Sequence, residues 1–145
     1  MPAFAGQFDW AQGLVWDVAF AAVDDDEIVR QGRLSKALVD TGATKTSISP
    51  IIAKELKLMP SGKKGVQTAN GLIDVNTYDV KVGFVFARKN NAGKIFKGDV
   101  HMLDKIIRAP ELPLDEGRFQ ALIGLDVLSH GILNLSYDGH FSFSY

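Results

Sequence analysis

The chain contains no cysteine among its 145 residues. This absence excludes disulfide bonds, zinc sites built on thiolates and a cysteine nucleophile. It is consistent with a reducing compartment, although many secreted proteins also lack cysteine. Histidine is scarce as well, and His101, His130 and His140 show no metal-ligand spacing. We therefore expect neither a metal site nor a cofactor.

A large excess of charge of one sign is also missing. The formal net charge is -1, and the basic residues occur as pairs such as Lys63-Lys64 and Arg88-Lys89 rather than as a patch. Nucleic acid is therefore not an expected partner. The amino terminus has no basic start and no sustained apolar run, unlike a signal peptide. No stretch approaches the roughly 20 apolar residues that span a bilayer. We expect a soluble, cytoplasmic protein without a membrane segment.

Strand-forming character is what the sequence has in quantity. Apolar residues make up 46% of the chain and charged residues 23%, as in an average globular domain. The length predicts one domain over residues 1–145. Two apolar runs, Gly13 to Ala22 and Ile28 to Asp40, flank Asp24-Asp25-Asp26 and predict a hairpin. Residues 1–33 are treated as an amino-terminal hairpin region whose placement the sequence does not fix. The three aspartates lack the spaced ligands of a calcium loop, so a solvated turn is favoured over a cation site.

Helix and turn signals divide the rest of the chain. Ser49 suits the N-cap and Pro50 the first position of a helix whose apolar face extends to Leu58. Asn70-Gly71 lies between two apolar runs and is a strong hairpin signal. The other expected elements are strands up to Phe86 and from Ile95 to Leu103, a short helix from Asp126, and a closing hairpin around Asp138-Gly139.

One short motif carries chemistry. Val39-Asp40-Thr41-Gly42-Ala43 follows a buried strand. Asp-Thr-Gly alone is a weak motif, and an aspartate that starts a turn after a strand explains it about as well. Its setting is more specific, because the apolar run would hold Asp40 at a rigid strand end while Gly42 lets the chain turn sharply and leaves the carboxylate uncovered. Thr41 supplies a hydroxyl, and Ala43 is small enough for close approach.

A second segment, Leu122-Ile123-Gly124, is an apolar strand that ends in glycine about eighty positions later. From Leu34 to the carboxyl terminus, the two segments together resemble the retropepsin-like aspartic peptidases. The resemblance implies a mostly-β fold, namely a closed retropepsin-like β-barrel with one or two short helices.

The resemblance also implies a role for each matching residue. Asp40 would be the catalytic acid, and Thr41 would grip the loop of the opposite protomer. Gly42 would contact substrate through its carbonyl, in an active-site loop that includes Ala43. The remaining implied sites are loop support by Leu122, Ile123 and Gly124, and a flap over the substrate at Thr68, Ala69, Asn70 and Gly71.

Retroviral members place an acid after the first motif and an arginine after the second glycine. Here Thr44-Lys45-Thr46 and Leu125-Asp126 stand there, so the chain looks closer to cellular and bacterial members.

The motif count bears on assembly. Asp-Thr-Gly occurs once and Asp-Ser-Gly not at all, whereas the family's mechanism uses two carboxylates that share one proton. If the chain is a peptidase, Asp40 must face Asp40 of a second copy across a two-fold axis. The alternating Phe141, Phe143 and Tyr145 either contribute a terminal strand to that dimer or pack into their own domain, and both alternatives stay open.

The sequence thus predicts an aspartic endopeptidase that acts as a homodimer on peptide or protein substrates. The rival hypothesis is a non-catalytic peptide-binding or dimerisation module on the same scaffold. A third is an unrelated β-barrel with an accidental motif. Ala43 adds one expectation, because a serine there would donate to the aspartate and favour its ionised form. Without that hydroxyl, we expect a less acidic working range than that of gastric-type enzymes.

Overall fold

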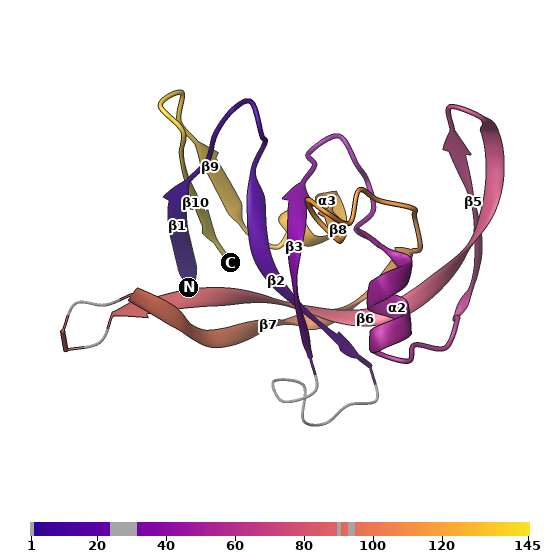
Figure 1. The fold of residues 1–145 in the computed structure, drawn as a ribbon, viewed down its shortest axis with the longest axis horizontal. Coiled ribbons are helices and arrows are strands. Elements are labelled where there is room, and N and C mark those ends of the chain that lie inside the picture. The colour runs from indigo at the N-terminus through magenta and orange to yellow at the C-terminus, as the bar shows by residue number, and fades with distance from the viewer. Residues whose placement is uncertain (1, 24–31, 90, 93–94) are drawn as a thin grey trace.

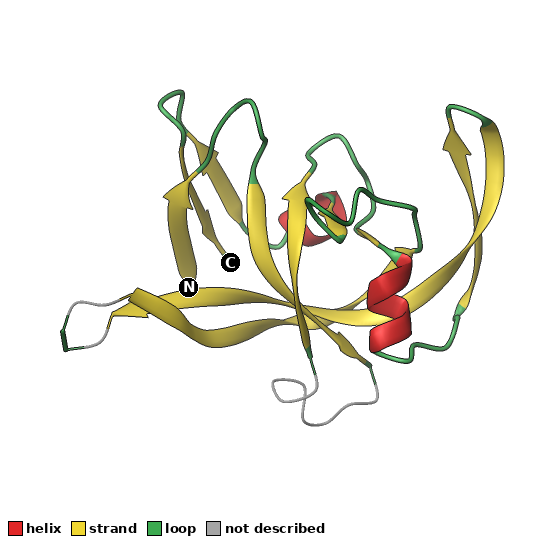
Figure 2. Ribbon diagram, in the orientation of Figure 1, coloured by secondary structure: helices red, strands yellow, loops and turns green. Residues whose placement is uncertain are grey.

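The computed structural model describes residues 2–23, 32–89, 91–92 and 95–145, and strands dominate it (Figure 2). The expected turn at Asp24-Asp25-Asp26 lies outside the described residues. The elements are, in chain order, β1 (Ala3–Gln7), β2 (Val15–Ala22), β3 (Arg33–Val39), β4 (Ser47–Ile48), α2 (Pro50–Glu55), β5 (Gly62–Thr68), β6 (Gly71–Lys89), β7 (Ile95–Pro110), β8 (Ala121–Ile123), α3 (Leu125–Leu128), β9 (Ile132–Leu135) and β10 (His140–Ser144).

The larger sheet has seven strands, in the order β4-β8-β3-β2-β6-β5, with β7 also paired to β6 (Figure 1). The antiparallel pairing of β2 with β3 confirms the hairpin predicted from the two apolar runs. The apolar character of β2 places it inside the sheet, since Val18 and Phe20 are fully buried on one face and Ala19 and Ala21 are buried on the other. Val80, Val82 and Phe84 of β6 complete this part of the core.

The closing hairpin is confirmed, but it belongs to a second sheet. This sheet has the order β1-β10-β9, so β10 lies between two neighbours. Phe143 is fully buried, and its ring lies 5.2 Å from that of Trp16. Phe4 of β1 packs edge-on against the same indole, with ring centroids 4.9 Å apart. Of the two alternatives for the terminal aromatic residues, the structure favours packing within their own chain.

The expectation of a closed barrel is wrong: neither sheet closes within the described residues. The outermost strands of the larger sheet are β4, which has only two residues, and β5. Strand β5 pairs with Gly71–Thr77 of β6, whereas β2 pairs with a later stretch of the same strand, Val80–Phe84. The tip of the β5–β6 hairpin stands out at one side of the molecule (Figure 1).

Both predicted helices are present and short. Ser49 occupies the N-cap of α2 and Pro50 its first position, as expected, although the serine side chain makes no capping hydrogen bond. Ile52 and Ala53 are the buried residues of this helix. In the β5–β6 hairpin, Thr68 pairs with Gly71. The turn therefore centres on Ala69-Asn70, one residue earlier than the sequence signal indicates.

Candidate active site

Asp40 lies at the end of β3, where β8 supports the strand. The two strands pair in parallel, with Leu38 opposite Leu122 and Val39 opposite Ile123. The Asp40 amide then donates a hydrogen bond of 2.9 Å to the Ile123 carbonyl. The structure therefore brings together the two segments that lie about eighty residues apart in the sequence.

The turn after β3 holds the Asp40 carboxylate in place. The Gly42 amide donates to Asp40 Oδ1 at 2.9 Å, and the Ala43 amide donates to the Asp40 carbonyl at 3.2 Å. Asp40 is half-buried, while Thr41 and Gly42 are exposed. Among the described residues, no hydrogen bond engages the other carboxylate oxygen, Oδ2. This arrangement leaves an anchored carboxylate with one oxygen free to meet a proton, a water molecule or a second carboxylate.

The loop after β3 is also tied to the start of α3. The Leu125 amide donates to the Ala43 carbonyl at 2.9 Å, and the Asp126 amide donates to the Thr44 carbonyl at 3.3 Å. Gly124 is needed between them because a Cβ there would lie 2.6 Å from the Lys45 carbonyl carbon and 2.9 Å from the Ala43 carbonyl oxygen. The segment from Ile123 to Asp126 thus holds the loop through backbone hydrogen bonds at both ends, to Asp40 and to Ala43 and Thr44.

Two further residues complete this attachment. Asp126 Oδ1 accepts hydrogen bonds from the Thr46 amide at 2.9 Å and from the Thr46 hydroxyl at 2.7 Å. The same hydroxyl oxygen accepts from the Gly124 amide at 3.0 Å. From the sequence, Asp126 is expected only as the start of a short helix, and neither Asp126 nor Thr46 is among the predicted site residues. The contact joins residues eighty positions apart, and neither residue lies in a motif that indicates it.

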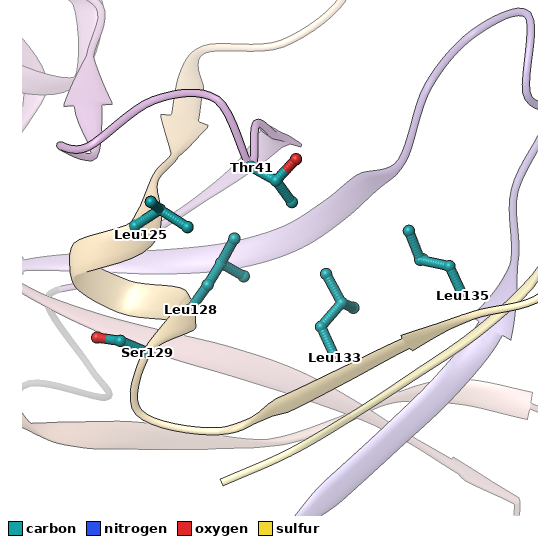
Figure 3. A pocket seen from close by; sticks show the side chains of 6 residues that line it. All are labelled: Thr41, Leu125, Leu128, Ser129, Leu133 and Leu135. Atoms are coloured by element: carbon teal, nitrogen blue, oxygen red, sulfur yellow. The ribbon is translucent and has the colours of Figure 1, made fainter.

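Thr41 faces an apolar groove rather than the core. The groove has a volume of about 410 Å³ and is lined by Thr41, Leu125, Leu128, Ser129, Leu133 and Leu135. Figure 3 shows the side chains of Thr41, Leu125, Leu128, Leu133 and Leu135 around one common space. They come from the loop after β3, from α3 and from β9.

The predicted flap residues lie apart from this cluster. Thr68, Ala69, Asn70 and Gly71 form the tip of the β5–β6 hairpin, where the Thr68 hydroxyl donates to the Gly71 carbonyl at 2.8 Å. Figure 1 shows the tip standing out at one side of the molecule, on the same upper side of the view as the loop after β3. The structure places these four residues together at the tip of the hairpin.

A search for other kinds of site adds little. Within residues 2–23, 32–89, 91–92 and 95–145, no three acidic or histidine side chains gather in a way that would hold a metal ion. None of the helices in the same ranges is long and apolar enough to cross a bilayer.

Comparisons with known proteins agree with this geometry. Residues 30–130 match the model of the family described as gag-polyprotein putative aspartyl protease. Among solved structures, the chain is similar to a retropepsin-like aspartic protease from Rickettsia conorii. The TM-score is 0.51 at 18% sequence identity, and the match covers 99% of this chain and 94% of the other. At that identity the likeness shows the fold. No curated protein sequence matches the chain significantly.

Proposed function

The chain belongs to the gag-polyprotein putative aspartyl protease family, and we propose that it is an aspartic endopeptidase whose active site is completed by a second copy. Each copy supplies one Asp40 to a pair of carboxylates that activates water for peptide-bond hydrolysis. The observation that carries the proposal is the state of Asp40. Its Oδ1 is fixed by the Gly42 amide, its backbone is fixed by Ile123, and its Oδ2 is open among the described residues.

The chemistry requires the two carboxylates in different protonation states. In aspartic proteases generally, two carboxylates about 3 Å apart share one proton because like charges at that distance do not both ionise. The ionised Asp40 takes a proton from water, and the water oxygen attacks the scissile carbonyl carbon. The protonated Asp40 of the second copy donates its proton to the carbonyl oxygen. Collapse of the tetrahedral intermediate then breaks the carbon–nitrogen bond, and the amine leaves with a proton from the pair.

The rest of the loop has defined parts in this proposal. Gly42 is exposed beside Asp40, and its carbonyl would accept a hydrogen bond from an extended peptide. Thr41 would contact the loop of the second copy. The residues Thr68 to Gly71 would cover the bound peptide as a flap. The support of the loop by Leu122, Ile123 and Gly124 would keep the two carboxylates at a fixed separation.

Cleavage of a peptide library by the wild-type protein and by Asp40→Asn tests the proposal. Asparagine keeps the shape of the side chain but neither takes nor gives the required proton. We expect kcat/KM to fall by roughly 10³-fold, within the range of general acid–base contributions. The matched control is Asp115→Asn, which makes the same charge change on an exposed residue between β7 and β8, and its kcat/KM should equal that of the wild type.

Cleavage that survives Asp40→Asn would remove Asp40 from the mechanism. Saturable peptide binding by the wild-type protein without cleavage would instead support the alternative of a peptide-binding module. Both outcomes are read from the same library, by mass spectrometry for products and by fluorescence anisotropy for binding.

A further inference from the structure

The two chain termini are already paired within one chain. Strand β10 lies between β1 and β9, with Ala3 opposite Ser144 and Gln7 opposite His140. The Tyr145 amide extends the ladder by donating to the Pro2 carbonyl at 3.0 Å. A second copy can therefore add no strand between these termini without breaking hydrogen bonds that each chain already makes. The pairing of β1 with β10 is thus complete, and β9, at one edge of this sheet, carries two of the leucines that line the apolar groove.

The apolar groove beside Thr41 has the properties of an interaction surface. Its leucines come from α3 and β9, and Leu125 and Leu135 remain 44% and 46% exposed in the single chain. Nearby Ile132, on β9, is 58% exposed. Large apolar side chains gathered at the surface mark an interaction site more often than scattered ones do. Leaving them in water is unfavourable, and a partner that covers them removes that cost.

The position of the groove identifies the partner. Thr41 lines the groove and directly follows Asp40, so any second copy that brings its Asp40 to this one must pass over or beside the groove. A two-fold axis at the paired carboxylates places the same surface of the two copies in contact. None of the described residues that line the groove is charged, so the surface meets its own copy without like-charge repulsion.

We propose that Leu125, Leu133 and Leu135 form, with Thr41, the seam that joins two copies of this chain. The inference rests on the proposed function, because the need for a second Asp40 is what makes the partner a copy. It goes further in naming the surface that is used, which lies on α3 and β9 beside the loop that carries Thr41.

Leu135→Asp and Leu125→Asp test the seam, with sedimentation velocity and the dependence of specific activity on enzyme concentration as readouts. A carboxylate in a covered apolar contact loses its hydration and finds no partner. We expect the dissociation constant of the dimer to rise by roughly 100-fold, and activity to return only at correspondingly higher enzyme concentration. The matched control is Ile106→Asp on β7. Ile106 is 47% exposed, like Leu135, but lies outside the groove, so its variant should associate and cleave like the wild type.

The absence of cysteine provides a second test that does not depend on a charged substitution. In an otherwise cysteine-free chain, Leu135→Cys introduces the only thiol. A short bifunctional maleimide should join two copies through Leu135→Cys and not through Ile106→Cys. Circular dichroism and thermal unfolding establish that each variant is folded.

The outcomes separate the seam from the proposed function. If Leu135→Asp and Leu125→Asp associate as tightly as the wild type while Asp40→Asn abolishes cleavage, the seam is overturned and the endopeptidase proposal stands. If both variants keep their association but show a raised KM for peptides with apolar side chains, the groove holds substrate and the seam is again overturned. If Leu135→Asp and Leu125→Asp associate more weakly than the wild type and Asp40→Asn abolishes cleavage, the results support both the seam and the endopeptidase proposal.

Discussion

Thr46 and Asp126 are joined by two hydrogen bonds, although eighty residues separate them in the sequence. The Thr46 hydroxyl also accepts from the Gly124 amide, and Thr46 is fully buried. The loop after β3 is thus closed onto α3 by a short series of polar contacts that runs through the buried Thr46. Buried hydrogen bonds of this kind contribute little net stability when complete but cost more when one partner is lost.

Thr46→Val removes the hydroxyl at nearly constant volume. The Gly124 amide and one position on the Asp126 carboxylate then lose their partner away from water. We expect the free energy of unfolding to fall by about 1–3 kcal/mol, measured by urea denaturation. Thr44→Val is the control because Thr44 is exposed; it should change the free energy of unfolding by less than about 0.5 kcal/mol. Equal losses in the two variants would show that the buried hydroxyl has no special role.

Gly124→Ala should be more damaging than its size suggests. Its Cβ would lie 2.6 and 2.7 Å from the carbonyl carbon and oxygen of Lys45, and backbone atoms in the middle of a held loop do not rotate away. We expect a loss of about 3 kcal/mol in the free energy of unfolding, accompanied by a loss of activity. At Gly117 the nearest atom to a Cβ is Asp115 Oδ1 at 3.6 Å, so Gly117→Ala should leave both the stability and the activity near those of the wild type.

Ala43→Ser tests the expected pH range of the proposed activity. A hydroxyl at this position, one residue past Gly42, would donate to the Asp40 carboxylate and favour its ionised form. The acid limb of kcat/KM against pH should therefore move to lower pH in the variant, while the wild type works in a less acidic range than gastric-type enzymes. A wild-type profile that peaks well below about pH 4, or an acid limb unmoved in the variant, would contradict this explanation.

The parts of the fold that the sequence predicts correctly are those with local signals. The β2–β3 hairpin follows from two apolar, strand-forming runs, α2 from Ser49-Pro50, and the β5–β6 hairpin from Asn70-Gly71. Even so, the turn lies one residue earlier than that signal, because Thr68 pairs with Gly71 and its hydroxyl bonds to the glycine carbonyl. A strong turn dipeptide fixes the existence of a hairpin better than its register.

The parts that the sequence does not predict depend on distant contacts. Strand β1 pairs with β10 across almost the whole chain, as Ala3 opposite Ser144 shows, and residues 3–7 carry no pattern that names this partner. The closed barrel was expected by resemblance, but the long strand β6 gives separate stretches to β5 and β2. In the candidate site, the motifs identified Asp40 and Ile123. They could not identify Asp126, because its role depends on a threonine eighty residues away.

Gly71→Ala tests the proposed flap. Gly71 has φ of +110°, a conformation that alanine adopts only with strain, although a Cβ there would meet no atom within 4 Å. The strain therefore acts on the hairpin tip alone. We expect kcat/KM to fall by about tenfold, as a misplaced substrate-covering loop produces, with little change in the thermal midpoint. Gly117→Ala is the control, because it makes the same change at an exposed glycine outside the flap, where the nearest atom to a Cβ lies 3.6 Å away. Unchanged kinetics in Gly71→Ala would mean that the tip does not cover substrate.

Tyr145 links the terminal sheet to the long β6–β7 hairpin, because its hydroxyl donates to the His101 carbonyl at 3.2 Å and its ring packs 5.0 Å from that of Phe84. Burial raises the pKa of Tyr145 from 10.0 to about 12. Between these values the unfolded chain loses the phenolic proton and the folded chain keeps it. The contribution of this group to stability is therefore fully present below about pH 10 and is lost as the pH rises toward about 12.

Tyr145→Phe has no such proton, so its free energy of unfolding should decline less steeply over that range. The measurement is the absorbance of the phenolate in the folded wild type, which should show an ionisation near pH 12 that the variant lacks. A midpoint for Tyr145 near pH 10 would contradict the prediction. It would mean that the hydroxyl is open to water and that the terminal sheet is not packed as described.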